Sequence, residues 1–180
     1  MIWTTELAER RLPIEGLTPS KYECQDGRLV LTPCGDVPSS LAKTVLARIL
    51  RLPVQQAGMA LYARTNMRLT DRRWIEPDLT LLWRCVKNVI WVPADRVVMP
   101  IEVESRFSRG KDWIDRPGMC AAAGVPYFMR VEVDDGAQVE LLRLDDSGEY
   151  VVQAKALAGQ EFRTDLPFSL SFDPAELLEH

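Results

Sequence analysis

The feature that most constrains this chain is an apolar run that ends in acids, Val97–Glu104. Its first five residues are all apolar or proline, which is typical of a strand that lies inside a sheet. Alternate side chains of a strand point to the same face, so Glu102 and Glu104 share one face and Val103 lies on the other. An ionised carboxylate on such a strand is costly to bury unless a cation or a metal ion accompanies it. The run therefore predicts a central strand whose acids have partners.

Other short segments alternate between apolar and polar residues, as strands do. The pair Asp26-Gly27 between two such segments is a strong signal for a β-hairpin. Strands are expected over residues 22–24, 28–32, 59–69, 78–83, 97–104, 127–133, 138–144 and 150–156, with a charged turn over residues 70–74.

Helical spacing of apolar residues is confined to a few segments. A short helix is expected over residues 4–11, and a longer one begins at Ser39 or Ser40 and ends before Pro53. A third covers residues 111–123, broken or restarted at Pro117, and a short terminal helix begins at Pro174. Strands flanked by few helices indicate an α/β fold with a mixed sheet, and they argue against an all-β barrel.

Length and composition favour one domain over residues 1–180, because 47% of the residues are hydrophobic and suffice for one core.

The net charge of −4 excludes a global positive field, so any contact with DNA must come from a local patch. The arginines and the tryptophan of residues 64–74 are candidates for such a patch, although a solvated charged surface is the favoured interpretation of these residues. The four cysteines form no CxxC pair, which argues against a zinc site and favours free thiols.

The ends of the chain carry little chemistry. The start has acids where a signal peptide needs an apolar stretch, and no run approaches the roughly 20 apolar residues of a membrane span. We therefore expect a cytoplasmic protein without a membrane partner. The one histidine, His180, is terminal, which excludes the commonest histidine-dependent hydrolases.

Candidate chemistry centres on Asp78 and Glu102. An acid at the start of one strand and an acid inside the next can meet across adjacent strands, where opposed side chains lie within about 5 Å. Two such carboxylates suffice for Mg²⁺ or Mn²⁺ when the ion also faces a phosphate. Glu104, on the same face as Glu102, is expected to assist. The alternative is that these acids are solvated at strand ends.

The same region resembles a known family through the order of its motifs. These are Pro77-Asp78, Glu102-Val103-x-Ser105, Asp112, Arg116-Pro117, residues 123–128 and Arg130-Val131-Glu132. The opening Tyr22-Glu23 with Asp26-Gly27 and the closing segment 170–177 match as well. Together they resemble the Uma-type restriction endonucleases of the PD-(D/E)XK superfamily, and the resemblance spans nearly the whole chain.

The resemblance implies a restriction-endonuclease-like mixed β-sheet core flanked by helices, with additional N- and C-terminal antiparallel strands. It also implies a Mg²⁺-dependent nuclease whose metal ligands come from Asp78, Glu102 and Val103, with Glu23 as an accessory acid. The family's catalytic lysine is replaced by Arg116. Arginine keeps the positive charge that stabilises phosphate but cannot share a proton with the attacking water.

Three functional interpretations follow. One is hydrolysis of phosphodiester bonds in DNA, with Arg116 stabilising charge and Lys111 as another candidate for the lysine role. The alternative is a catalytically impaired nuclease fold that acts as a binding or interaction module; a metal-free structural subunit is a third reading. Under the nuclease interpretation a symmetric homodimer is expected, because cutting both strands often needs two sites.

Overall fold

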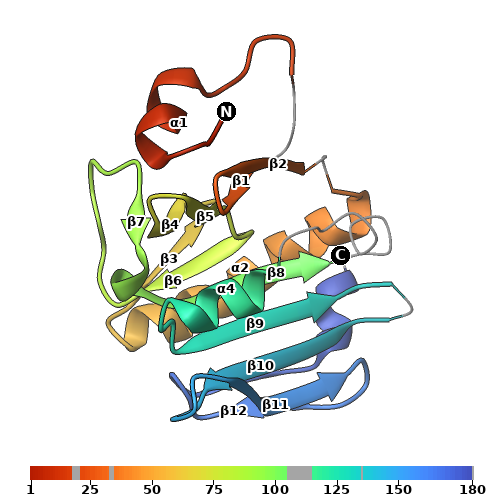
Figure 1. The fold of residues 1–180 in the computed structure, drawn as a ribbon. Coiled ribbons are helices and arrows are strands. Elements are labelled where there is room, and N and C mark those ends of the chain that lie inside the picture. Colours follow the sequence, from red (N-terminus) through yellow and green to blue (C-terminus); the bar gives the residue numbers. More distant parts are fainter. Residues whose placement is uncertain (18–20, 33–34, 105–114, 135, 180) are drawn as a thin grey trace.

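The computed structural model describes residues 1–17, 21–32, 35–104, 115–134 and 136–179. Its centre is a six-stranded sheet in the order β11-β10-β9-β8-β6-β3 (Figure 1). The strands are β3 (Ala60–Ala63), β6 (Leu79–Leu82), β8 (Val97–Glu104), β9 (Tyr127–Glu132), β10 (Gln138–Leu144) and β11 (Tyr150–Leu157). The β8–β9 pair is parallel and the other pairs are antiparallel, so the predicted mixed sheet is confirmed, and the acid-bearing strand β8 lies inside it.

A second sheet of five strands, in the order β2-β1-β5-β4-β7, lies beside the first. Its strands are β1 (Lys21–Gln25), β2 (Arg28–Thr32), β4 (Met67–Thr70), β5 (Arg73–Ile75) and β7 (Val92–Pro93). Strands β1 and β2 form the predicted hairpin. Asp26 and Gly27 both adopt positive φ at its turn, at 52° and 82°, as the tight hairpin turn requires.

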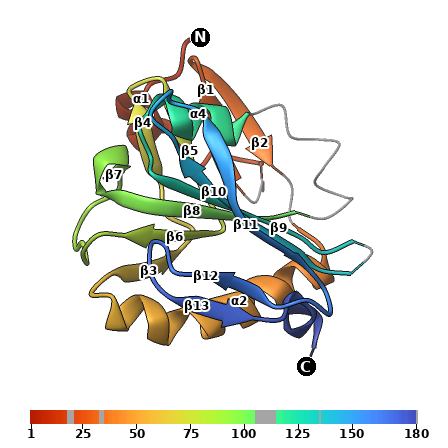
Figure 2. The ribbon, with the colours of Figure 1, turned by 90° about the horizontal axis from the view of Figure 1, so that it is seen from below.

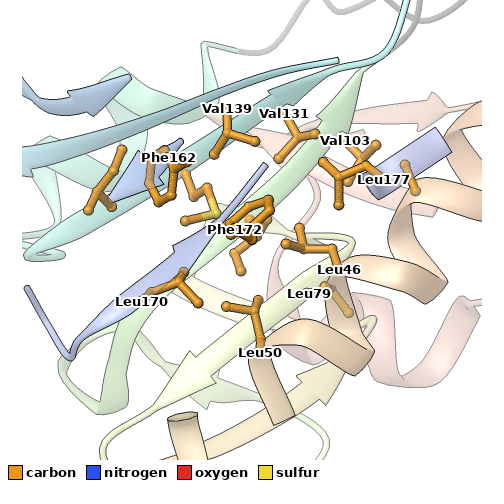
Figure 3. Close-up of a cluster of buried hydrophobic side chains, with 14 of the residues drawn as sticks. Leu46, Leu50, Leu79, Val103, Val131, Val139, Phe162, Leu170, Phe172 and Leu177 are labelled. Carbon is orange, nitrogen blue, oxygen red and sulfur yellow. The ribbon is translucent and has the colours of Figure 1, made fainter. Parts of the chain in front are cut away.

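The six-stranded sheet is covered on both faces (Figure 2). Helix α2 (Val37–Gln56), the hairpin β12 (Phe162–Thr164) and β13 (Leu170–Phe172), and the 3-10 helix η2 (Pro174–Leu178) cover one face. Leu46 and Leu50 of α2 point toward Leu79 and Phe172 in this core (Figure 3). On the other face lie α4 (Arg116–Ala122) and parts of the second sheet, with Met119 packed near Phe128. Helix α1 (Thr5–Arg11) packs beside the second sheet, and the 3-10 helix η1 (Ala94–Arg96) precedes β8.

The expected bounds of α2 were wrong at both ends. Asp36 caps the helix by accepting a hydrogen bond from the Ser39 amide at 2.9 Å, so the helix begins at Val37 instead of after a serine cap. Aspartate caps a helix as well as serine does. At the other end Pro53 lies inside the helix. The buried Val54 continues the apolar stripe of the helix beyond this proline, and its packing carries the helix on to Gln56.

Two expectations for residues 59–74 also need correction. The single strand over residues 59–69 divides into β3 and β4, which belong to different sheets, and Arg64 between them adopts a positive φ of 52°. The charged turn over residues 70–74 is shorter, because β5 already begins at Arg73. Strand β7 had no prediction, whereas the antiparallel pair β12–β13 matches the additional C-terminal strands that the family resemblance implied. The N-terminal part of the helix expected over residues 111–123 lies outside the described residues, and its described part begins at Arg116.

In the part of the chain that the structure describes, none of the helices combines the length and the apolar character that a membrane crossing needs.

Candidate active site

Six charged side chains meet between β1 of the second sheet and β8 of the central sheet. They come from β1, α2, β8, α4 and the residue before β6, and we call them the charged cluster: Lys21, Glu23, Lys43, Asp78, Glu102 and Arg116. All except Lys43 are buried. Buried ionised groups need partners of opposite charge, and every member of this cluster has at least one.

The register of the sheet brings the two predicted acids together. Leu79 pairs with Ile101 in the antiparallel β6–β8 ladder, which places Asp78, one residue earlier, beside Glu102, one residue later. Asp78 is fixed by a hydrogen bond from the Val103 amide to its Oδ2 at 2.9 Å. The prediction that these carboxylates meet across adjacent strands is thus matched by the described geometry.

Both carboxylates converge on one ammonium group. The Nζ of Lys21 lies 3.0 Å from Oδ1 of Asp78 and 3.1 Å from Oε2 of Glu102. Lys43, from α2, contacts the same Oδ1 of Asp78 at 3.0 Å. The site therefore holds a cation between Asp78 and Glu102, and it is a lysine side chain.

Glu23 and Arg116 form the second half of the cluster. The Arg116 guanidinium donates from Nη2 to Oε2 of Glu23 and from Nε to Oε1 of Glu23, the latter at 3.2 Å. Glu23 also accepts hydrogen bonds from the Glu76 amide at 2.9 Å and from the Thr32 hydroxyl at 3.3 Å. Arg116 is the first residue of α4, and the same Nε lies 3.3 Å from Oε1 of Glu102. Arg116 thus links the accessory acid to the central strand.

Burial and charge act in opposite directions on these groups. Burial raises the pKa of Glu102 to about 7, although Lys21 and Arg116 oppose the shift. Burial also disfavours the charged form of Asp78, but Lys21 and Lys43 outweigh it, and the pKa of this carboxyl falls below its ordinary value. Burial disfavours the ammonium of Lys21, yet Glu102 and Asp78 hold its pKa above the ordinary value. Lys21 is therefore a cation at neutral pH.

The site faces a cavity of about 390 Å³ beside α2 and β3. Its polar lining includes Lys21, Ser40, Lys43, Thr44, Arg64 and Asp78. The Lys43 side chain is 29% exposed, whereas that of Asp78 is 5% exposed. A small anion or cation can therefore approach Asp78 past Lys43.

The remaining predicted residues are placed differently. Glu104 lies two positions beyond Glu102 on β8 and pairs across the parallel ladder with Glu132. Val103 contributes its amide to Asp78, while its side chain packs in the core that α2 covers (Figure 3). Lys111 lies outside the described residues. The assignment of metal ligands and catalytic residues stays a prediction.

Two of the four arginines in the candidate patch of residues 64–74 are paired with acids. Arg64 donates to Glu76 at 2.6 Å and Arg73 donates to Asp26 at 2.6 Å. Trp74 is fully buried, and its indole donates to the Tyr22 carbonyl at 2.8 Å, so it supports the core and cannot stack on a base.

Sequence reasoning missed Lys21 and Lys43. A signal for Lys21 was present, because Lys21 and Glu23 are two residues apart on one strand and so share a face. Lys43 had no comparable signal, since its contact with Asp78 depends on how α2 lies against the sheet.

The donor set fits a divalent cation such as Mg²⁺. Two carboxylate oxygens aim at one centre, and one or two carboxylates are the usual protein share of a magnesium shell. Oε1 of Glu102 is buried and accepts no hydrogen bond from the described residues, but it faces the Arg116 guanidinium at 3.3 Å, so Oε2 is the glutamate oxygen that a metal ion would take. Glu23 faces Arg116 instead, and the described residues contain no group of three or more acid, histidine or cysteine ligands arranged for a metal. The residues fit a site with two carboxylates.

Comparison with known proteins gives the family. The Uma2 family, described as "Putative restriction endonuclease", matches residues 10–175. The chain belongs to this family. The resemblance deduced from the motifs is thereby confirmed, and family and fold together support a nuclease function.

A solved structure has the same fold. It is described as "a putative nuclease belonging to DUF820" from Anabaena variabilis, with a TM-score of 0.61 and 15% sequence identity. The match covers 90% of this chain and 93% of that chain, and at this identity it establishes the fold alone. No curated protein matches the sequence.

Proposed function

We propose that this Uma2 protein is a metal-dependent endonuclease that hydrolyses phosphodiester bonds in DNA, with Asp78 and Glu102 as the ligands of Mg²⁺ or Mn²⁺. The observation that carries the proposal is the convergence of Oδ1 of Asp78 and Oε2 of Glu102 on one cationic centre, within 3.1 Å of each. The centre borders an open cavity, so a phosphate can reach it.

When bound, the cation would polarise the phosphate and lower the pKa of a water molecule. The protein's own residues have separate tasks. Lys43, half-buried at the cavity, would attract the phosphate, because its ammonium faces both Asp78 and solvent. Arg116 is a positioning residue: buried behind Glu102 and Glu23, it holds both carboxylates in place. Lys111 and Glu104 remain candidates for assisting roles.

A specific observation favours a second candidate function, a nuclease fold that binds without cutting. Three carboxylates and three cations balance one another in the charged cluster, and no divalent ion is needed for neutrality. The arginine at the family's lysine position points the same way, since it cannot accept a proton.

The deciding experiment is cleavage of plasmid, single-stranded DNA and RNA by purified protein with Mg²⁺ or Mn²⁺. The variants are Glu102→Gln and Asp78→Asn, with Glu140→Gln as the matched control. Glu140 is an acid of β10 whose side chain is 13% exposed, and its ion pairs are with Lys155 at 3.3 Å and Arg130 at 3.9 Å, neither of which belongs to the cluster. Cutting that is lost in the first two variants and kept in the control supports the nuclease.

Absence of cutting by the wild type with either metal would contradict the nuclease and favour the binding function. Retention of the DNA in a mobility-shift assay by the same protein would then support that second function. Sedimentation of the active protein tests the expected homodimer.

A further inference from the structure

The Lys21 ammonium lies where a cation held by Asp78 and Glu102 belongs. It contacts one oxygen of each carboxylate, at 3.0 Å and 3.1 Å, and its side chain is only 8% exposed. Both carboxylate side chains are as deeply shielded, at 5% and 6% exposure. Lys21 is thus a buried residue at the centre of the site and not a surface lysine.

We propose that Lys21 is a resident counter-ion of this site, and that a divalent cation binds by displacing its ammonium. The inference rests on the proposed function, in which Asp78 and Glu102 are the metal ligands. Lys21 then sets how tightly the protein holds its metal.

The metal ion and the Lys21 ammonium cannot occupy the site together, for reasons of both space and charge. Magnesium binds carboxylate oxygens at about 2.0–2.1 Å, so an ion on the same two oxygens would lie within contact distance of the present ammonium. Two cations this close repel strongly in a site with little water. The ammonium must therefore leave the oxygens before the metal takes them.

The structure also provides a place for the displaced group. Lys21 lines the cavity of about 390 Å³ together with Ser40 and Thr44, whose hydroxyls can accept hydrogen bonds from an ammonium. Lys43 is already the second cation on Asp78. Loss of Lys21 would leave Asp78 with Lys43 and Glu102 with Arg116, so the cluster keeps partners for its acids and gains one net negative charge.

The test is Mn²⁺ binding, followed by the electron paramagnetic resonance signal of the free ion. Lys21→Met removes the ammonium with little change in side-chain length. Lys43→Met is the matched control, because it removes the same charge from the same carboxylate without touching Glu102. Removal of a competing cation should tighten Mn²⁺ binding by about tenfold or more in Lys21→Met, and by clearly less in Lys43→Met.

The outcomes separate this inference from the proposed function. Binding in Lys21→Met that is no tighter than in the wild type, or no tighter than in Lys43→Met, overturns the inference and leaves the metal site standing. Failure of every protein to bind Mn²⁺, or binding that survives Asp78→Asn, overturns both.

A second measurement follows the Lys21 ammonium directly in the wild type. The side-chain ammonium of Lys21, labelled with ¹⁵N, gives a nuclear magnetic resonance signal that the Lys21→Met spectrum identifies. Titration with Mg²⁺ should shift this signal until it saturates. The midpoint of the shift should equal the midpoint of metal binding. A signal that stays unchanged while Mg²⁺ binds would refute displacement.

Discussion

Arg116→Met should be among the most destabilising single substitutions in this protein. Arg116 is 5% exposed, and its guanidinium donates two hydrogen bonds to Glu23, which is fully buried. Among the described residues, Glu23 would keep hydrogen bonds from the Glu76 amide and the Thr32 hydroxyl, and Glu102 would lose a contact of 3.3 Å. Removal of one partner from a buried ion pair costs about 3–5 kcal/mol of unfolding free energy. In a chain of this size that corresponds to a fall in Tm of roughly 6–20 °C.

Urea unfolding followed by tryptophan fluorescence measures this loss. The matched control is Arg64→Met, because Arg64 also pairs with a glutamate, at 2.6 Å, but its side chain is 56% exposed. The Glu76 side chain is 12% exposed, but the Arg64 side chain lies largely in water, so this pair should contribute about 1 kcal/mol, well below the buried pair. Addition of Glu23→Gln to Arg116→Met should recover part of the loss, since the neutral amide needs no cation. A loss for Arg116→Met no larger than that for Arg64→Met would refute the reasoning.

Three further predictions follow from the same structure. Leu46→Ala, at a fully buried position of α2, should cost about 2–5 kcal/mol in urea unfolding; a cost under 1 kcal/mol would contradict the described core. Asp36→Ala removes the cap of α2 and should cost about 0.5–2 kcal/mol by thermal unfolding, whereas Asp36→Asn should cost little. The exposed Cys85 should be alkylated rapidly at pH 8, whereas burial raises the pKa of Cys24 to about 11, so its labelling should accelerate only as the pH approaches that value. Peptide mass spectrometry assigns the labels, and rapid labelling of Cys24 at pH 8 in folded protein would contradict its burial.

The proximity of Asp78 and Glu102 was predictable. Alternate residues of a strand share a face, and side chains on adjacent strands can lie opposite each other. The proximity of Glu23 and Arg116 was different: only resemblance to a family suggested it, since no local pattern links residues 93 positions apart. Lys43 stayed hidden for the same reason, because its contact depends on the packing of α2.

Local rules failed where tertiary packing overrode them. Pro53 predicted the end of a helix, yet the buried side chain of Val54 carries α2 past it. The segment over residues 59–69 predicted one strand, but Arg64 turns the chain from one sheet into the other. Lys21 shows a different limit. Its shared face with Glu23 was visible, but the sequence does not say that this face meets two further acids.

The most direct test of the account is anomalous diffraction from crystals of the protein soaked in Mn²⁺ at a concentration that supports its activity. We predict one manganese peak bonded to Oδ1 of Asp78 and Oε2 of Glu102, with the Lys21 ammonium turned away into the cavity. A structure with no peak between these carboxylates, or with manganese bound only elsewhere, would contradict the assignment of this cluster as the metal centre.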